Sequence, residues 1–351
     1  MPNVKPETGA NEFPMDWARV AGQPACQARF KACPEDFRVE ESLGFEPDGS
    51  GGHVWLELEK TGMNTDFLAR RLARIAGVPA RAIGYSGLKD RQAVTTQWFS
   101  IDLAGRQEPN WSELEQDGVR VLTCTRSGRK LHRGSHRHNA FVLVLREIQG
   151  DEAVLEVALR RVQSEGVPNY FGPQRFGRGG GNLAAAAALF SGRLRIKDRN
   201  RRGLYLSAAR SWLFNQVLSR RVSEGTWNRL LPGEAVTLDG THSFFPAAEE
   251  DPDLPRRLAA FDIHPSGPLW GRGVPGSEAG ALALETELLG PYELFRVGLE
   301  AAGLRQERRA LRLRPGDMAW EFLPGQALRL AFSLPAGAYA TSVLGELIEV
   351  V

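Results

Sequence analysis

The sequence is short of the residues and patterns that mark secreted, membrane-bound and zinc-binding proteins. It has three cysteines in 351 residues, Cys26, Cys33 and Cys124, and no two of them form a CxxC pair. We therefore expect neither a disulfide framework nor a structural zinc site. No apolar run reaches the roughly 20 residues that a membrane helix needs, and the N-terminus lacks the basic-then-apolar pattern of a signal peptide. These absences predict a cytoplasmic protein without a membrane segment.

Common catalytic motifs are missing as well. The stretch Gly179-Gly-Gly-Asn182 lacks the Lys-Ser/Thr of a phosphate loop, and no strand directly precedes it as a dinucleotide-binding fingerprint requires. There is no Gly-x-Ser-x-Gly elbow. The six histidines have no metal-ligand spacing, and three of them share a loop with arginines that would repel a metal ion. We expect no metal site and interpret those three histidines as nucleic-acid contacts or solvated residues.

Positive charge is present, and it is segregated. The net charge is only +2, yet residues 126–146 carry six Lys or Arg, three His and no acid, and residues 193–202 carry six more Lys or Arg with one acid. Such runs suit a polyanion surface, although either run alone is equally compatible with a solvated loop. The candidate RNA-binding residues in these runs are Arg133, Arg137, Arg193 and Arg195. A glycine-rich connection adds Arg175 and Arg178.

One carboxylate stands out as a candidate catalytic group. Asp90 lies in a glycine turn between Lys89 and Arg91, just before a strand-like stretch that ends at Phe99. Neighbouring cations favour the ionised carboxylate, and a partly desolvated carboxylate can act as a nucleophile or a base. The alternative is that Asp90 is an ordinary turn or capping residue.

The hydrophobic pattern predicts an α+β protein of two domains. We expect antiparallel neighbouring strands at residues 37–41 and 53–59, and a helix from Asn64 or Thr65 to residue 76 with Phe67, Leu68, Leu72 and Ile75 on its buried stripe. Asn182 is expected to cap an alanine-rich helix, and a long helix is expected over 206–222. Residues 1–25 have no periodicity and are predicted to form a loose arm. Strands at both ends with a glycine-rich and helix-rich middle indicate an inserted domain.

Four patterns in the same order resemble one family. They are Pro34-Glu-Asp-Phe37-x-Val-x-Glu41, Gly87-x-Lys-Asp90-x-x-Ala-x-Thr-x-Gln97, Gly166-Val-Pro-Asn-Tyr-Phe-Gly172 with Gln174-Arg-Phe-Gly177, and Leu334-Pro-Ala-Gly-x-Tyr339-Ala-Thr-Ser342. Together they resemble the TruD family of tRNA pseudouridine synthases, which act on uridine 13 of the D arm. The resemblance covers nearly the whole chain.

The resemblance implies an architecture. A catalytic pseudouridine-synthase domain, with a mixed and largely antiparallel sheet flanked by helices, would comprise residues 1–165 and 314–351. An inserted α+β domain specific to the family would comprise residues 166–313.

The resemblance also implies site residues. Asp90 would be the catalytic aspartate, and Phe37, Asn139 and Tyr339 would contact the substrate. Tyr339 departs slightly from the family pattern, in which Phe can also occupy this position. Both residues offer a stacking face, so the open question is whether the tyrosine hydroxyl adds a contact. Lys31 aligns with a basic residue that pairs with the active carboxylate. Taken singly, Phe37 is more often a core residue, Asn139 a turn former and Tyr339 a packing residue at a helix start.

The implied reaction is an isomerisation, so no cofactor or metal is expected. The expected partner is tRNA, with no protein partner, and the chain is expected to be a monomer. Asp90 would act as a nucleophile at the sugar or the base, or as a base that starts an elimination. Two other functions remain open: an RNA-binding or chaperone protein without catalysis, and an RNA hydrolase with Asp90 as general base.

Overall fold

The structure, a computed structural model, describes residues 13–115, 117–241, 243–248 and 250–351. The chain divides into two compact units. The sheet unit consists of Pro24–Leu159, Pro315–Ala340 and Leu347–Val351, and the middle unit consists of Arg160–Arg314, Thr341–Glu346 and the described residues before Pro24. The units thus differ from the expected domain ranges at the N-terminus, at residues 160–165, at Arg314 and at residues 341–346. Their identification as catalytic and inserted domains stays a prediction.

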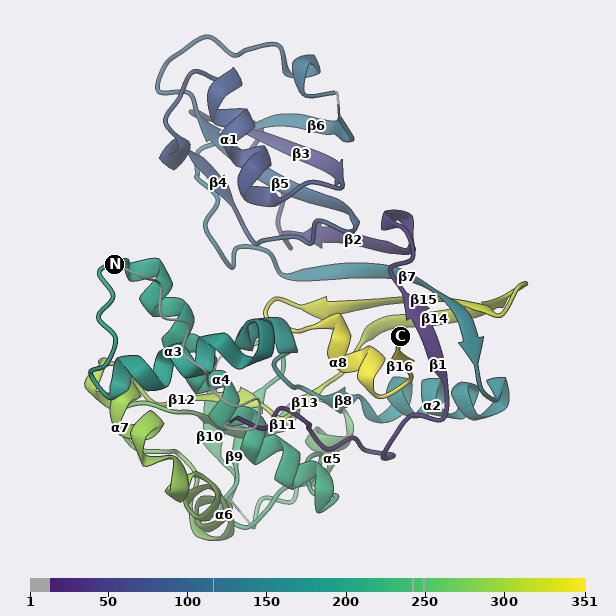
Figure 1. Cartoon of the computed structure of the whole chain (residues 1–351), viewed down its shortest axis with the longest axis vertical. Helices are drawn as coiled ribbons and strands as arrows, with labels where there is room; N and C mark the ends of the chain where they lie inside the picture. The colour runs from purple at the N-terminus through teal and green to yellow at the C-terminus, as the bar shows by residue number, and fades with distance from the viewer. Residues whose placement is uncertain (1–12, 116, 242, 249) are drawn as a thin grey trace. The chain divides into compact units, whose positions relative to one another are not determined.

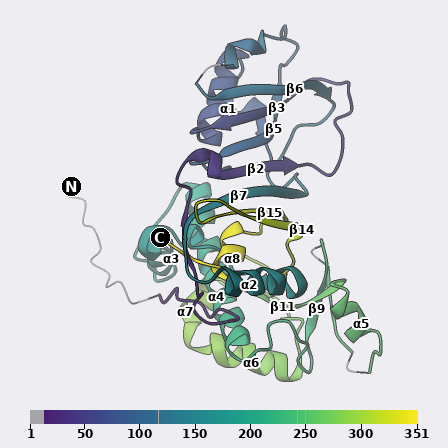
Figure 2. The same cartoon turned by 90° about the vertical axis from the view of Figure 1, so that its right-hand side faces the viewer.

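The sheet unit is built on a ten-stranded sheet, whose strands follow one another in Figure 2. Its main path runs β14 (Gly316–Leu323), β15 (Ala327–Pro335), β7 (His138–Gln149), β2 (Phe37–Ser42), β5 (Val94–Asp102), β3 (His53–Thr61) and β6 (Val119–Ser127). Three short strands lie off this path: β1 (Gln27–Phe30), β16 (Glu349–Val350) and β4 (Ile83–Tyr85). Among the described strands of this sheet, only β2–β5 and β1–β16 pair in parallel, so the predicted mixed, largely antiparallel sheet is confirmed.

One expected strand pairing is wrong. The prediction makes β2 and β3 neighbours, but β5 lies between them, parallel to β2 and antiparallel to β3. The other neighbour of β2 is β7, which runs antiparallel to it. Alternation of apolar residues identifies a strand and its two faces, but it does not identify the partner strand.

Helix α1 (Thr65–Ile75) covers one face of this sheet (Figure 1). Asn64 is its N-cap residue, in line with the predicted start, and Gly77, with a φ of 64°, follows its end. Leu68 and Leu72 are buried in a core shared with β3 and β5, but Phe67, which is predicted to lie on the buried stripe, is 52% exposed. It precedes Leu68, and a step of one residue turns about 100° around a helix, which places it off that stripe.

The middle unit combines helices with small sheets. Its helices include α3 (Gly181–Phe190), α4 (Arg199–Ser223), α5 (Leu254–Ala259), α6 (Ala279–Leu289) and α7 (Glu293–Ala301). Its strands β10 (Phe244–Pro246), β9 (Ala235–Leu238), β11 (Ile263–Leu269) and β12 (Glu307–Ala310) form one sheet, and β8 (Val167–Pro168) pairs with β13 (Arg312–Leu313). Two helices, α2 (Glu152–Glu165) and α8 (Ala340–Gly345), lie where the chain passes between the units. Six 3-10 turns complete the described elements: Pro34–Asp36, Ala80–Ala82, Trp111–Leu114, Pro173–Phe176, Arg178–Gly180 and Gly290–Tyr292.

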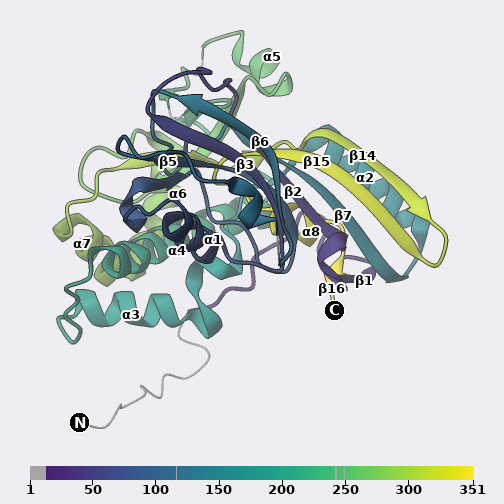
Figure 3. The same ribbon diagram turned by 90° about the horizontal axis from the view of Figure 1, so that it is seen from above.

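Two helix starts differ from the prediction. Asn182 does not cap α3, which begins at Gly181; its side-chain amide donates instead to the carbonyl of Arg175 at 3.1 Å. Helix α4 begins at Arg199 rather than near 206, because the Asp198 carboxylate accepts hydrogen bonds from the amides of Asn200 and Arg201. Part of the second basic run therefore lies in the first turn of α4, which packs along α3 (Figure 3).

The described part of the N-terminal arm is packed rather than loose. Phe13 contacts the rings of Trp212 and Phe295 at centroid distances of 5.7 and 5.5 Å. Trp17 stacks on Tyr170 at 6.1 Å. Aromatic burial of this kind offsets the lost chain entropy without regular secondary structure. Residues 1–12 of the predicted arm lie outside the described residues.

Within the described ranges, no helix combines the length and apolar character needed to cross a lipid bilayer.

Candidate active site

The loop that carries Asp90 is held by two buried side chains. The Thr65 hydroxyl accepts from the amide of Lys89 at 2.9 Å and donates to the Gln97 side-chain oxygen at 2.9 Å. The Gln97 side-chain amide in turn donates to the carbonyl of Gly87 at 3.2 Å. Thr65 begins α1 and Gln97 lies in β5, so the loop is fixed to a helix and to a central strand.

A buried lysine lies beneath the same loop. The ammonium of Lys60, at the end of β3, donates to the carbonyl of Met63 at 2.6 Å and to the main-chain carbonyl of Asp90 at 3.1 Å. Burial lowers the pKa of Lys60 to about 8, against the opposing attraction of the Asp90 charge. Sequence reasoning missed this residue. The available signal was a lysine on the inward-facing positions of an alternating strand.

Lys31 is the cation that pairs with Asp90. Its ammonium forms an ion pair with Oδ2 of Asp90, and Gln92 N donates to Oδ1 at 3.0 Å. Burial acts to raise the pKa of Asp90, but the hydrogen bond and charge of Lys31, with the amides of Gln92 and Arg91, hold that pKa below its usual value. The carboxylate is therefore ionised at neutral pH and remains 41% exposed.

The sequence neighbours of Asp90 do not have the role expected of them. The Lys89 ammonium contacts Glu41 and Asn139, and Arg91 Nε donates to the carbonyl of Gly62 at 3.1 Å. The loop thus directs both flanking cations to other partners, and sequence adjacency does not place them on the carboxylate.

Phe37 lies in a row of rings on one face of the sheet. It stacks on Phe141 at 6.1 Å and meets Phe30 edge-on at 5.3 Å. The Lys31 ammonium lies 4.2 Å from the Phe37 ring centroid. Phe37 is 7% exposed, so a base that stacks on it has to share the ring with Lys31. Lys31, Phe37 and Asp90 are thus brought together.

Asn139 lies on the same sheet face, linked to the loop through Lys89. It is directly opposite Glu41 across the β2–β7 pair. Lys89 Nζ lies 2.6 Å from Oε2 of Glu41 and 2.6 Å from Oδ1 of Asn139. The Asn139 Nδ2 lies 3.2 Å from Nε2 of His136. Burial and the Lys89 charge lower the pKa of His136. His136 is one of the three loop histidines predicted to be nucleic-acid contacts or solvated residues, but its ring belongs to this network.

The remaining candidates of the sheet unit lie at its surface. Tyr339 is partly buried, in the turn between β15 and α8. Arg137 is exposed, and its carbonyl accepts from the amide of Ala336 at 3.1 Å, which ties this turn to the start of β7. Arg133 is exposed and lies 5.6 Å from the ring centroid of Tyr85.

The candidates of the middle unit are not equivalent. Arg178, Arg193 and Arg195 are exposed or partly exposed, as RNA contacts require. Arg175 donates to the Ser207 hydroxyl at 3.1 Å and lies 5.5 Å from the ring centroid of Phe171. Internal packing thus already engages Arg175.

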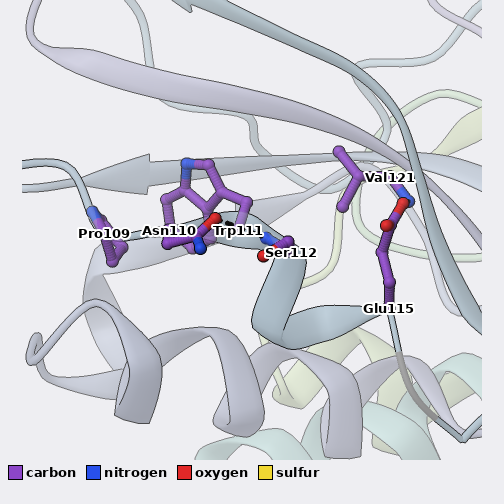
Figure 4. A pocket seen from close by; sticks show the side chains of 6 residues that line it. All are labelled: Pro109, Asn110, Trp111, Ser112, Glu115 and Val121. Carbon is purple, nitrogen blue, oxygen red and sulfur yellow. Dashed lines mark hydrogen bonds between the residues drawn. The ribbon is translucent and has the colours of Figure 1, made fainter.

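One small open cavity, of about 330 Å³, lies elsewhere in the sheet unit (Figure 4). It is lined by Pro109, Asn110, Trp111, Ser112, Glu115 and Val121. None of these residues is a predicted site residue, and the lining holds one titratable side chain, Glu115. The described residues contain no group of three or more His, Cys, Asp or Glu side chains arranged to hold a metal ion.

Comparison with known proteins decides the family. The family model described as "tRNA pseudouridine synthase D (TruD)" matches residues 18–195 and 181–347 of this chain. The chain belongs to the TruD family. The predicted family resemblance is therefore confirmed.

Individual TruD relatives match over almost their whole length. The chain is 51% identical to tRNA pseudouridine synthase D of Methylococcus capsulatus over 334 residues, 95% of this chain and 94% of that protein. It is 52% identical to the protein of the same name from Nitrosococcus oceani over 328 residues, 93% and 92% of the two chains. A crystal structure of a protein named as a putative TruD from Methanosarcina mazei has the same fold, with a TM-score of 0.75 and 22% identity over 97% of this chain and 99% of that one.

Proposed function

We propose that this chain is a tRNA pseudouridine synthase that isomerises uridine 13 in the D arm of tRNA, with Asp90 acting on the flipped-out nucleotide. The observation that carries the proposal is the Lys31–Asp90 ion pair beside Phe37. This ion pair keeps a half-exposed carboxylate ionised. The carboxylate lies on a loop held by the buried side chains of Thr65 and Gln97, in a chain of the TruD family.

The proposed chemistry balances without a second reactant. The N1–C1′ bond of uridine breaks, a C5–C1′ bond forms, the hydrogen on C5 leaves as a proton and N1 gains one. No electrons are exchanged with another group, so the proposal includes no cofactor and no metal. Asp90 attacks the sugar or the base, or removes the proton that starts an elimination. All three roles require an ionised carboxylate.

The substrate must also be extracted and held. Moving the uridine out of the helical stack costs roughly a few kcal/mol. Protein contacts to the flipped uridine offset this cost. We assign stacking to Phe37 or Tyr339 and an edge hydrogen bond to Asn139. Phosphate contacts are assigned to Arg133, Arg137, Arg175, Arg178, Arg193 and Arg195. In this proposal residues 1–165 and 314–351 are the catalytic domain, residues 166–313 are the inserted domain, and the enzyme is a cytoplasmic monomer that needs no protein partner.

The deciding experiment uses purified protein and an unmodified tRNA transcript. Wild-type protein is expected to convert uridine 13 to pseudouridine at constant RNA mass. Asp90→Asn should abolish conversion, a loss of at least about a thousandfold for a group essential to the chemical step, and leave tRNA affinity nearly unchanged. Asp253→Asn is the matched control, because Asp253 is an exposed carboxylate of the middle unit paired with Arg256. Its activity should equal that of wild type.

The same incubation separates the other two functions. RNA cleaved by wild-type protein would indicate a hydrolase, and binding without any change in the RNA would indicate a chaperone. Conversion retained by Asp90→Asn would remove Asp90 from the mechanism.

A further inference from the structure

The ammonium of Lys89 joins two residues that face each other across neighbouring strands. Glu41 of β2 is opposite Asn139 of β7, and Lys89 Nζ lies 2.6 Å from a side-chain oxygen of each. The side chains of Lys89 and Glu41 are 5% and 0% exposed. Removing two charges from water is costly, and such a pair is weak evidence for stability. Its position beside Asp90 points to a role in the site.

The Lys89 contact fixes which way the Asn139 amide faces. An ammonium can only donate, so the amide atom that it meets is the oxygen. The amide nitrogen therefore lies on the opposite side, 3.2 Å from Nε2 of His136. Burial lowers the pKa of His136, so its ring is neutral at pH 7 and accepts at Nε2 when the ring hydrogen is on Nδ1. Asn139 is partly exposed, so its second amide hydrogen can donate to a bound base.

Asn139 and Asp90 lie toward different ends of the same sheet face. Asp90 is bound by Lys31, whose ammonium lies over the Phe37 ring. Phe37 is opposite Leu143, four residues along β7 from Asn139, which is roughly 13 Å of strand. In the proposed function, a uridine between these ends has its glycosidic bond, which the reaction breaks, at Asp90. The far edge of the ring, which carries O4, then faces Asn139.

We infer that Lys89 and Glu41 are positioning residues that turn Asn139 into a hydrogen-bond donor only, and that Asn139 thereby selects uracil by donating to O4. The inference rests on the proposed function, since it assumes a flipped uridine in this site. Cytosine differs from uracil at this position by an amine, which presents hydrogens to the hydrogens of Asn139. Without Lys89 the amide can turn end for end and offer its oxygen to that amine.

The test compares binding of two tRNA transcripts that differ only by uridine or cytidine at position 13. Binding is measured in the Asp90→Asn background, where no turnover occurs. The uridine transcript should bind about tenfold more tightly, the range for reading one base edge. Adding Lys89→Met should bring the ratio close to one. Arg91→Met is the control, because Arg91 bonds to Gly62 and not to Asn139, and it should keep the ratio.

A second variant covers the case in which Lys89→Met does not fold. Asn139→Asp has two acceptor oxygens in place of the amide, keeps a partner for Lys89, and should also lose the preference for uridine. A ratio that stays near tenfold in the folded variants, or that is near one in Asp90→Asn alone, would overturn the inference. If wild-type protein forms pseudouridine but Lys89→Met leaves the ratio of the two transcript affinities unchanged, only this inference is refuted. Wild-type protein that forms none refutes the proposed function.

Discussion

The ionisation of Asp90 depends on a residue that lies far away in the sequence. Lys31 is 59 residues before it and adopts a φ of 59°, a left-handed conformation that is uncommon outside glycine. The backbone at Lys31 turns there between β1 and the 3-10 turn before β2. The strained turn directs the ammonium to both Asp90 and the Phe37 ring. Such strain persists only where surrounding contacts hold it.

Replacing Lys31 should shift the acid limb of the pH–rate profile to higher pH. Lys31 lowers the pKa of Asp90 while burial raises it, so Lys31→Met leaves burial dominant and the pKa rises. If the ionised carboxylate is the active form, the variant loses activity at a higher pH than wild type as the pH falls. Single-turnover rates from about pH 4 to 8 on an unmodified tRNA transcript, a range that spans the usual carboxyl pKa, measure the shift.

The control for that profile is Arg29→Met. Arg29 lies in β1 close to Lys31 and pairs with the exposed Glu147 rather than with Asp90. Its acid limb should coincide with that of wild type. A Lys31→Met profile that also coincides with wild type would mean that Lys31 does not control the ionisation of Asp90.

At the level of elements, periodic segments were predictable and their partners were not. Helix α1 follows from apolar spacing and a cap, and strand β5 follows from its strand-favouring residue types. The order of β2, β5 and β3 depends on contacts between residues distant in sequence, which alternation does not encode. The start of α4 was missed because its first turn is basic, and the helix is held there by the Asp198 cap instead of by apolar burial.

The candidate site shows the same limit. Asp90 is singled out by its glycine turn and flanking cations, but Phe37, Asn139 and Lys31 become candidates only because four patterns jointly resemble one family. The structure brings Lys31 and Phe37 to Asp90. The partners of Lys89 and the buried Lys60 could not be inferred, because a lysine beside an aspartate in sequence does not reveal which carboxylate it meets in space.

The paired strands β8 and β13 join the two ends of the segment predicted to be inserted. Val167 is opposite Leu313 and Pro168 is opposite Arg312. Gly166, just before β8, has a φ of 80°, and a Cβ there would lie 2.6 Å from the carbonyl oxygen of Leu313. The chain can therefore close here without strain only with glycine.

Gly166→Ala should accordingly lower the free energy of unfolding by more than the cost of the left-handed backbone alone. The left-handed backbone costs roughly 1–2 kcal/mol for a residue with a Cβ, and the clash with backbone raises the total to about 3 kcal/mol. Gly225→Ala is the control, because Gly225 has a φ of 66° and no heavy atom lies within 4 Å of the point that its Cβ would occupy. Urea unfolding of both variants measures the difference. Equal losses would show that the clash relaxes without cost.

For the whole molecule, family membership and local structure answer different questions. Matches over more than 90% of this chain and of its relatives establish the family and the fold. They do not assign Lys89 or Glu41 a role. That assignment comes from distances within the sheet unit, and it can fail while the family assignment stands.

The second basic run provides the test of how the protein holds a large polyanion. Arg193 and Arg195 are exposed beyond the end of α3, and Arg193 donates to the nearby Ser191 hydroxyl. Reversing both charges should weaken tRNA binding about tenfold or more at physiological salt. If each arginine contacts one phosphate, losing both contacts should also reduce the slope of log affinity against log salt by roughly 1.4 to 1.8. Filter binding over a range of salt concentrations measures both quantities.

Arg256→Glu is the control for charge reversal. Arg256 is exposed in the same unit, but it pairs with Asp253, so a general change in net charge should appear in this variant as well. Because exposed charges beyond about 10 Å are screened at roughly 0.1 M salt, only a direct phosphate contact should change the slope. An unchanged slope in the Arg193 and Arg195 double variant would mean that this run is a solvated surface, and phosphate binding would then have to come from the arginines of the sheet unit.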